Sequence, residues 1–354
     1  MPITVKALQK TGPDAPFEVR EIERRDPRAS DVVIDIEAAG ICHSDIHTIR
    51  QEWGEVTYPL AVGHEIAGVV SAVGEGVTRF QVGDRVGVGC MVNSCGECEQ
   101  CEAGEEQACL RGMVGTYAAT DVDGSVTQGG YSQKVTVDER FVLRIPDGLE
   151  LDEAAPLLCA GITSYSPLAR WGVTEGDKVA VVGLGGLGHM GVQLAAAMGA
   201  EVTVLSRSLK KEEMARELGA ERLLATSEEG FFDAHAGQFD LILNTVSAAI
   251  PLDDYLGLLK PHGVLACVGA PPEPLPVQMF SLIMGGKVLT GSNIGGIAET
   301  QEMLDFCAEH GLGARIERIG IDDVDGAYER VVDGDVLFRF VIDTSTFEDA
   351  EPVG

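Results

Sequence analysis

The segment from Gly40 to His47 gathers side chains that can bind a metal ion or move a proton. Its eight residues include one thiol, one hydroxyl, one carboxylate and two imidazoles, namely Cys42, Ser44, Asp45, His43 and His47. A cysteine beside an apolar segment is often no more than a small buried residue, so this segment predicts a metal site only if it has partners. Potential partners are His64, which Glu65 follows, and Cys159.

Four closely spaced cysteines form the clearest motif of the chain, and they are Cys95, Cys98, Cys101 and Cys109. Four thiolates at this density match a closed tetrahedral zinc site, in which sulfur fills every position and none remains for a substrate. Redox cysteines or an iron–sulfur cluster are the alternatives. One common iron–sulfur pattern has proline after its last cysteine, whereas Leu110 follows here. We therefore predict a structural zinc ion that stabilises an otherwise irregular lobe.

The stretch Gly183-Leu184-Gly185-Gly186-Leu187-Gly188 has the Gly-x-Gly-x-x-Gly spacing of dinucleotide-binding turns. That spacing alone is a weak indication. Here a β-branched run (178–182) precedes it, and an Ala-rich helical stretch and a second β-branched run (201–205) follow, as a βαβ unit requires. The glycines let a pyrophosphate approach the helix N-terminus, whose free N–H groups favour anions. The motif predicts a coenzyme that contains a pyrophosphate.

The residues after the second of these runs indicate which coenzyme fits. An NAD site normally has Asp or Glu here to bind the ribose hydroxyls. This chain has hydroxyl and cationic side chains instead, at Ser206, Arg207, Ser208, Lys210 and Lys211. Such groups can bind the 2′-phosphate of NADP through charge-assisted hydrogen bonds. The alternative is that the cations merely flank an exposed helix, but the whole chain has only eight lysines and two of them lie here, so we predict NADP(H).

The charge balance is strongly acidic, with 56 acidic and 26 basic residues and a formal net charge of −30. An anionic surface repels phosphate backbones, so a nucleic-acid partner is disfavoured. Many acids and few lysines also suit a cytoplasm of high salt concentration, where screening relieves self-repulsion. An acidic enzyme without salt adaptation is the alternative.

The pattern of apolar residues predicts a cytoplasmic protein that has no contact with a membrane. Residues 1–6 do not show the charged and apolar regions of a secretory signal. The uncharged run 179–200 is long enough to raise the question of a membrane span, but its glycines and its strand–turn–helix pattern argue against one. Nine cysteines in such a chain favour metal ligands or buried thiols over disulfides.

A length of 354 residues predicts about two domains. In the first, alternating residues predict short strands over 3–37, and a strand within 59–73 that has His64 at its entrance. A helical pattern over 151–169 includes Cys159. In the second, strands that alternate with helices predict a doubly wound parallel sheet; these strands are expected at 178–182, 201–205, 239–244, 264–269 and 288–292.

The C-terminal part predicts a helix at 298–310 and a strand at 337–343, which is expected to rejoin the first domain. The acidic stretch 344–354 has no apolar pattern, so it is expected to be mobile.

Taken in chain order, these motifs resemble those of the zinc-dependent alcohol dehydrogenases of the medium-chain dehydrogenase/reductase superfamily. The resemblance covers nearly the whole chain. Three features are similar to the cinnamyl-alcohol-dehydrogenase-type, NADP-dependent aldehyde reductase branch, and these are Cys42-His43-Ser44-Asp45, the glycine motif with His189 after it, and Ser206-Arg207-Ser208. The resemblance implies an α/β protein with a GroES-like β-rich catalytic domain at 1–155, completed by 296–354, and a Rossmann NADP-binding domain at 156–295. The family is commonly dimeric, so we expect a homodimer.

The resemblance also implies a catalytic zinc ion held by Cys42, His64 and Cys159, with the fourth position open. Together with the structural ion, this makes two zinc ions per chain. Zinc at such a site lowers the pKa of an alcohol and polarises a carbonyl, so that hydride can move between the substrate and the nicotinamide.

Four neighbouring residues receive roles from the same resemblance. Ser44 and His47 would relay a proton by way of the coenzyme ribose. Asp45 would accept a hydrogen bond from a ligating imidazole, most simply that of His64, and Glu65 would lie beside the metal and reach it transiently. His43 receives no role.

The predicted reaction is the reversible oxidation of a primary alcohol to an aldehyde, run as aldehyde reduction. Four apolar or aromatic residues are candidates for the substrate pocket, which favours a small hydrophobic substrate; each could equally be ordinary packing, and they are Trp53, Met91, Tyr117 and Ile294. One alternative is an NAD-dependent polyol dehydrogenase, which would need an acidic residue near Ser206. The other is a zinc-free quinone-reductase-like protein of the same fold, which would lack Cys42, His64 and Cys159.

Overall fold

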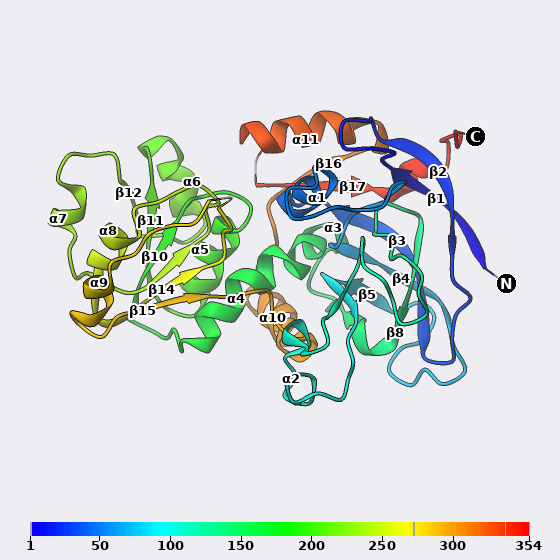
Figure 1. The fold of residues 1–354 in the computed structure, drawn as a ribbon, viewed down its shortest axis with the longest axis horizontal. Coiled ribbons are helices and arrows are strands. Elements are labelled where there is room, and N and C mark those ends of the chain that lie inside the picture. The colour runs from blue at the N-terminus through cyan, green and yellow to red at the C-terminus, as the bar shows by residue number, and fades with distance from the viewer. Residues whose placement is uncertain (1, 272, 337, 354) are drawn as a thin grey trace. The chain divides into compact units, whose positions relative to one another are not determined.

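The structure, a computed structural model, describes residues 2–271, 273–336 and 338–353. The chain divides into two compact units. Unit 1 is Met1–Cys159 with Gly295–Gly354, and unit 2 is Ala160–Ile294. Figure 1 labels helices and strands of both units where there is room. In the described part of the chain, no helix combines the length and the apolar character needed to cross a membrane.

Unit 1 is built mainly from strands. In β8 (Lys134–Asp138) burial alternates residue by residue, because successive side chains of a strand point to opposite faces. The other elements, with bounds, are β1 (Ile3–Gln9), β2 (Glu18–Arg24), β3 (Asp31–Gly40), α1 (His43–Ile49), β4 (Ile66–Val73), β5 (Arg85–Val88), β6 (Met91–Asn93), α2 (Glu99–Glu102), β7 (Val114–Gly115), β9 (Leu143–Arg144), α3 (Leu151–Ala154), α10 (Ile297–His310), β16 (Ile316–Ile319), α11 (Val324–Asp333) and β17 (Arg339–Asp343).

The main sheet of unit 1 has the order β16-β17-β3-β4-β5-β9, and β8 also pairs with β3. β17 comes from the C-terminal segment and runs antiparallel to β3, with Val341 opposite Gly40. This pairing brings the C-terminal segment beside the end of β3, where the segment with Cys42 begins. The predicted helix at 298–310 is α10, and of the predicted strand at 337–343 the described residues 339–343 form β17, while Leu337 lies outside the described residues.

The acidic stretch after β17 packs against unit 1, so the expectation of a mobile tail was wrong. Phe347 is fully buried, and Lys6 Nζ donates hydrogen bonds to the carbonyls of Phe347 (2.9 Å) and Glu348 (3.0 Å). The N–H of Val353 donates to the carbonyl of Val19. One buried aromatic side chain, one lysine and one backbone hydrogen bond thus hold a segment that has no apolar pattern.

Unit 2 alternates strands with helices. Its elements are α4 (Ala160–Arg170), β10 (Lys178–Val182), α5 (Gly188–Ala197), β11 (Glu201–Ser206), α6 (Glu212–Glu217), β12 (Arg222–Ala225), α7 (Phe231–Ala234), β13 (Phe239–Asn244), α8 (Leu252–Gly257), β14 (Leu259–Cys267), α9 (Met279–Ile283) and β15 (Val288–Gly291). The strands form a parallel sheet in the order β12-β11-β10-β13-β14-β15. This is the strand order of a dinucleotide-binding Rossmann fold, which confirms the predicted α/β class. β12, a strand of four residues, was not predicted from the sequence.

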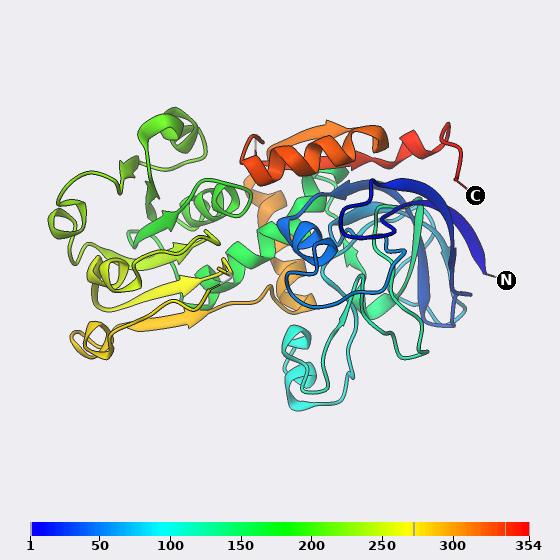
Figure 2. The ribbon, with the colours of Figure 1, turned by 45° about the horizontal axis from the view of Figure 1, so that its top comes forward.

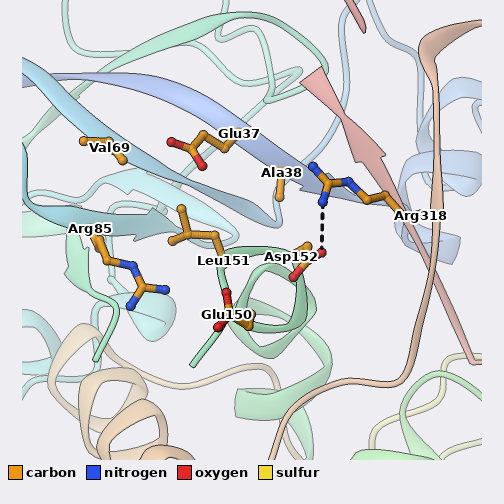
Figure 3. A pocket seen from close by; sticks show the side chains of 8 residues that line it. All are labelled: Glu37, Ala38, Val69, Arg85, Glu150, Leu151, Asp152 and Arg318. Atoms are coloured by element: carbon orange, nitrogen blue, oxygen red, sulfur yellow. Dashed lines mark hydrogen bonds and ion pairs between the residues drawn. The ribbon is translucent and has the colours of Figure 1, made fainter. Parts of the chain in front are cut away.

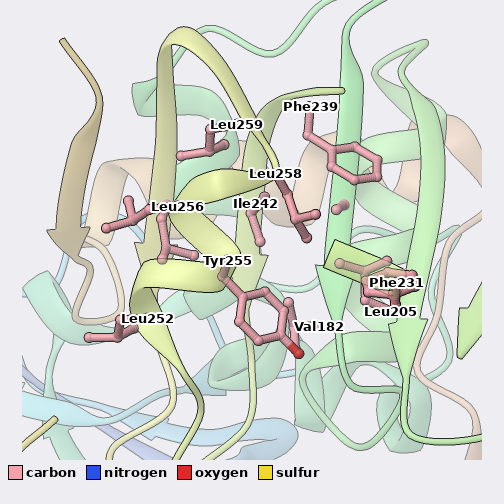
Figure 4. Packing of buried hydrophobic residues seen from close by; sticks show 12 residues of the cluster. Val182, Leu205, Phe231, Phe239, Ile242, Leu252, Tyr255, Leu256, Leu258 and Leu259 are labelled. Carbon is pink, nitrogen blue, oxygen red and sulfur yellow. The ribbon is translucent and has the colours of Figure 1, made fainter. Parts of the chain in front are cut away.

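One core cluster of unit 2 joins the sheet to α7 and α8, as Figure 4 shows. Ile242 of β13 and Leu265 of β14 are fully buried in it, next to Leu256 of α8. Strands covered on both faces become apolar throughout rather than alternating. The helices therefore fix the sheet whose carboxyl ends carry the glycine-rich turn.

The helical pattern predicted over 151–169 forms two α-helices with a break between them. α3 ends at Ala154, a 3-10 turn spans Ala155–Leu158, and α4 begins at Ala160. Pro156 has no N–H to continue an α-helical ladder, and Cys159 at the break has a non-helical φ of −128°. The break gives Cys159 a backbone position that a regular helix would not offer.

Candidate active site

Four ligand-type side chains from distant parts of unit 1 meet in one buried cluster. One sulfur, nitrogen or oxygen atom of each lies within 4.8 Å of those of the others, and the residues are Cys42, His64, Glu65 and Cys159. The Sγ atoms of Cys42 and Cys159 are 3.9 Å apart. The structure therefore brings together the three predicted zinc ligands and the carboxylate that follows one of them in the sequence.

Each member of this cluster lies where a regular element begins or ends. Cys42 is the N-cap residue of α1 and has an extended backbone. His64 follows Gly63, whose φ of +103° lies in the left-handed region, and precedes β4. Cys159 lies between a 3-10 turn and α4. Element ends combine a rigid support with freedom to aim a side chain.

Asp45 links the segments that carry Cys42 and His64. Its fully buried carboxylate accepts hydrogen bonds from the N–H groups of Cys42 (2.9 Å) and Gly63 (3.2 Å). Its Oδ1 lies 3.9 Å from Nδ1 of His64. Burial raises the pKa of Asp45, whereas the hydrogen bond from Cys42 favours the charged form.

The chemistry of the cluster fits a zinc ion. Nε2 of His64 is buried and has no hydrogen-bond partner among the described residues, while Nδ1 faces Asp45. A hydrogen bond with Cys159 lowers the pKa of Cys42 well below its usual value, although burial opposes this. Thiolate and imidazole are the ligands that zinc prefers, and the carboxylate behind the imidazole is the usual support of such a ligand.

Glu65 forms an ion pair with Arg339 of β17, and both side chains are buried. Gly40 leaves room for this carboxylate, since a Cβ atom at position 40 would lie 2.0 Å from Oε2 of Glu65. The predicted neighbour of the metal is thus balanced by a cation from the far end of the chain.

The two predicted relay residues lie three positions apart on α1, so they share a face of the helix. Oγ of Ser44 lies 3.5 Å from Sγ of Cys42. Nδ1 of His47 is hydrogen-bonded to the carboxylate of Glu52, and the ring of Trp53 stacks on His47 at 4.8 Å between centroids. Glu52 and Trp53 therefore fix the orientation of the His47 ring.

The other candidate residues lie on different elements of the fold. Tyr117 stacks on His64, with centroids 5.4 Å apart and an angle of 11° between the rings, and Met91 is buried in β6. Ile294 belongs to unit 2. His43 is exposed at the start of α1, where its ring centroid lies 6.0 Å from that of His47.

The four predicted structural-zinc ligands also meet in unit 1. Their sulfur atoms lie within 4.8 Å of one another, and they are Cys95, Cys98, Cys101 and Cys109. Backbone N–H groups of Cys101 and Leu110 lower the pKa of Cys98 to about 6, which favours the thiolate that binds metal. In Figures 1 and 2 the loop with α2 extends away from the main sheet, so a metal ion would stabilise a lobe with little core of its own. All nine cysteines carry free thiols.

The glycine-rich turn of unit 2 has room where a pyrophosphate would lie. A Cβ atom at Gly185 would meet no atom within 4 Å, whereas at Gly188 it would lie 2.2 Å from the carbonyl oxygen of Gly183. Gly183 itself has a φ of +89°. Two of these glycines are therefore needed for the turn and its packing, and Gly185 leaves open space at the start of α5.

The predicted phosphate-binding residues follow β11. Ser206 ends this strand, and Arg207, Ser208 and Lys210 are exposed. Lys211 differs, because its Nζ donates a hydrogen bond to the carbonyl of Leu184 in the glycine-rich turn (2.9 Å). Lys211 therefore ties the start of the next helix to that turn, while the other side chains remain accessible.

The described part of the chain also has cavities outside the metal clusters. One of about 280 Å³ in unit 2 is lined by Asn244, Cys267 and Gly291 among others, at the carboxyl ends of β13, β14 and β15, where open α/β sheets bind ligands. The second cavity, of about 420 Å³, lies in unit 1 (Figure 3) and is lined by Arg318 and Asp152, which form an ion pair, among other residues. None of the predicted site residues lines this second cavity.

Several residues at the active site were not predicted from the sequence. The sequence could have indicated Arg339 as a site residue, because it is the single cation in a strand that is otherwise mostly apolar. Tyr131, which donates to Asp45, follows the turn glycines Gly129 and Gly130 and carries a polar group into the core. The thiol of Cys90 lies 4.0 Å from the carbonyl oxygen of Leu158. No motif in the sequence distinguishes Cys90 from a cysteine that merely packs in the core.

Comparison with known proteins agrees with this geometry. A model of the alcohol dehydrogenase GroES-like domain matches residues 28–147, and a model of zinc-binding dehydrogenases matches residues 186–309. A probable formaldehyde dehydrogenase of Bacillus subtilis is 59% identical, over 96% of this chain and 98% of that protein. An NADP-dependent alcohol dehydrogenase C of Mycolicibacterium smegmatis is also 59% identical, over 97% and 99%. The structure of a cinnamyl alcohol dehydrogenase from Sorghum bicolor has a TM-score of 0.94 and 42% identity, over 99% of this chain and 100% of that one.

A Rossmann unit, together with a β-rich unit that carries a thiolate–imidazole cluster, defines a zinc-binding dehydrogenase. The chain belongs to the zinc-binding alcohol dehydrogenase family, and its matches include members of the cinnamyl alcohol dehydrogenase branch. These findings confirm the family, the fold class and the enzyme class predicted from the sequence.

Proposed function

We propose that this enzyme interconverts small hydrophobic primary alcohols and aldehydes with NADP(H), and that aldehyde reduction is its working direction. The observation that carries this proposal is the buried cluster of Cys42, His64 and Cys159, in which Nε2 of His64 has no partner among the described residues. Zinc bound there would supply a Lewis acid that polarises a carbonyl and lowers the pKa of an alcohol.

The residues of α1 would handle the proton. Ser44 lies close enough to Cys42 to meet a substrate hydroxyl at this site. His47, held by Glu52 and Trp53, would exchange that proton with solvent, because its side chain is partly exposed. Asp45 would orient His64, and the ion pair with Arg339 would hold Glu65 next to the cluster.

The coenzyme would bind to unit 2. Open space at Gly185 and the start of α5 suit the pyrophosphate, and the residues after β11 suit a 2′-phosphate because they are hydroxyls and cations without a carboxylate among them. We assign this role to Ser206, Arg207, Ser208 and Lys211 together with the turn residues Gly183, Leu184, Gly185, Gly186, Leu187 and Gly188. The name of the M. smegmatis relative supports NADP as the coenzyme.

The domain roles follow from the same assignments. Residues 1–155 with 296–354 would form the catalytic domain, and residues 156–295 the coenzyme domain, in a cytoplasmic protein. The substrate would contact apolar groups, for which Tyr117 and Trp53 are candidates because they stack on His64 and His47.

Zinc analysis and a coenzyme assay test this function. We expect two zinc ions per chain, and NADPH oxidation with aliphatic, aromatic or allylic aldehydes that is faster than NADH oxidation. Cys159→Ser should lose one zinc ion and the activity, whereas Cys267→Ser, a matched change in unit 2, should keep both zinc ions. A wild-type protein with one zinc ion and no NADPH-dependent aldehyde reduction would overturn the proposal, and activity on polyols with NAD would favour the polyol alternative.

The homodimer would form through the edge of the parallel sheet. β15 is the last strand of this sheet. Along α9 and the residue after it, four apolar side chains are 58–71% exposed, and these are Met279, Phe280, Ile283 and Met284. Contiguous exposed apolar side chains next to the outer edge of a sheet mark an interface. Phe280→Asp should convert the dimer to a monomer in sedimentation, whereas Val82→Asp, an exposed valine of unit 1, should leave it unchanged. A monomeric wild type would contradict this.

A further inference from the structure

Tyr131 reaches the site from a loop that the mechanism above does not use. Its side chain is fully buried, and its hydroxyl donates a hydrogen bond of 2.9 Å to Oδ2 of Asp45. The hydroxyl of Tyr328 on α11 donates in turn to the hydroxyl of Tyr131 (3.2 Å). Three segments far apart in the sequence thus form one hydrogen-bonded row that ends at the carboxylate behind His64.

The Asp45 carboxylate contacts both segments that carry predicted zinc ligands. Oδ2 accepts from the N–H of Cys42, and Oδ1 accepts from the N–H of Gly63 and faces Nδ1 of His64. The hydroxyl of Tyr131 donates to Oδ2 from outside the two ligand-bearing segments, and the side chain of Tyr117 also interacts with this carboxylate. Without the Tyr131 hydroxyl, Oδ2 would lose one hydrogen bond and keep the one from the N–H of Cys42.

The chain packs closely around Tyr131. A Cβ atom at Gly63 would lie 2.4 Å from the Tyr131 ring, so the ring lies directly against the backbone before His64. Arg24, which is buried, donates to the carbonyls of Gln128 (2.5 Å), Gly129 (2.7 Å) and Lys134 (2.8 Å). These bonds fix both ends of the loop that presents the tyrosine.

We propose that Tyr131, supported by Tyr328, is a positioning residue that holds the Asp45 carboxylate against His64 and thereby controls how firmly the catalytic zinc ion is retained. Groups behind a ligating imidazole typically change metal affinity or activity by about 10- to 100-fold. The inference rests on the proposed function, because it requires zinc at Cys42, His64 and Cys159.

Selective loss of one zinc ion tests this role. In the holoenzyme, Tyr131→Phe removes only the hydroxyl and leaves the ring against Gly63. We expect a chelator to remove one zinc ion per chain about 10-fold faster than from wild type, while the zinc ion of Cys95, Cys98, Cys101 and Cys109 leaves at the wild-type rate. We also expect kcat to fall with the KM for NADPH unchanged, and the pH profile of alcohol oxidation to shift. General destabilisation would accelerate the loss of both zinc ions.

Two further variants complete the experiment. Tyr255→Phe removes a hydroxyl from a buried tyrosine of unit 2 and should leave both zinc rates unchanged. Tyr328→Phe removes only the outer hydroxyl and should accelerate the loss of the same single zinc ion by about threefold, which keeps the test decisive if Tyr131→Phe does not fold. Zinc release at the wild-type rate from both Tyr131→Phe and Tyr328→Phe, or from Tyr328→Phe alone if Tyr131→Phe does not fold, would overturn the positioning role but not the proposed function. A wild type without zinc at the cluster would instead overturn the proposed function.

Discussion

Arg339 and Glu65 form an ion pair between the last strand of unit 1 and the residue that follows a predicted zinc ligand. Both side chains are buried. Removal of one partner of such a pair leaves an uncompensated charge, which costs about 3–5 kcal/mol. We expect Arg339→Met to lower the free energy of unfolding of the zinc-loaded protein by about this amount, measured by urea denaturation.

The double variant Glu65→Gln/Arg339→Met is the control for this prediction. It removes both charges, so it should recover most of the lost stability. A single variant as stable as wild type would show that the pair does not neutralise Glu65.

Loss of one structural-zinc ligand should leave the catalytic cluster intact. We expect Cys98→Ser to reduce zinc from two ions to one per chain, and to expose residues 94–113 to proteolysis, because the loop has little core of its own. Elemental analysis and mass spectrometry of the fragments measure both effects. Cys267→Ser should retain two zinc ions, and an equal loss in both variants would contradict the assignment.

Coenzyme choice should depend on Arg207. A charge-assisted hydrogen bond contributes about 1.5–3 kcal/mol, and a carboxylate at this position would repel the 2′-phosphate. We therefore expect Arg207→Asp to raise the KM for NADPH by about 10- to 100-fold and to change the KM for NADH far less. Arg216→Asp makes the same charge change on α6 and should alter neither; equal effects of Arg207→Asp on both coenzymes would argue against NADP selectivity at this position.

Proton transfer should depend on Ser44. A positioned proton-transfer group contributes about 10²- to 10⁴-fold to the rate, so we expect Ser44→Ala to lower kcat by about 10²-fold or more with the zinc content unchanged. Ser71→Ala, in β4, provides a control with the same chemical change. If kcat stayed at the wild-type value, Ser44 would have no part in the relay.

The net charge of −30 should make the fold depend on salt. Repulsion between exposed carboxylates extends over about 10 Å in 0.1 M salt and about 3 Å in 1 M salt. We expect the melting temperature to rise by about 4 °C or more between these concentrations, which for units of this size corresponds to about 1 kcal/mol. Activity and melting temperature that do not change in dilute buffer would show that the acidic composition is not a salt adaptation.

The parallel sheet and the glycine-rich turn were predictable because their patterns are local. β10, the turn at Gly183 and α5 follow one another within twenty residues, and burial on both faces makes the strands apolar. Short or irregular elements escaped prediction. β12 is only four residues long, and the break at Cys159 depends on Pro156 and on packing rather than on hydrophobic period.

The sequence by itself determined which side chains could bind metal and coenzyme, because ligand chemistry resides in residue type and spacing. Only the tertiary structure decided which of them meet. It brings Cys42, His64 and Cys159 together, places Arg339 on Glu65 and aims Tyr131 at Asp45. These contacts join residues far apart in the chain. They arise from strand pairing and close packing, which a local sequence pattern does not predict.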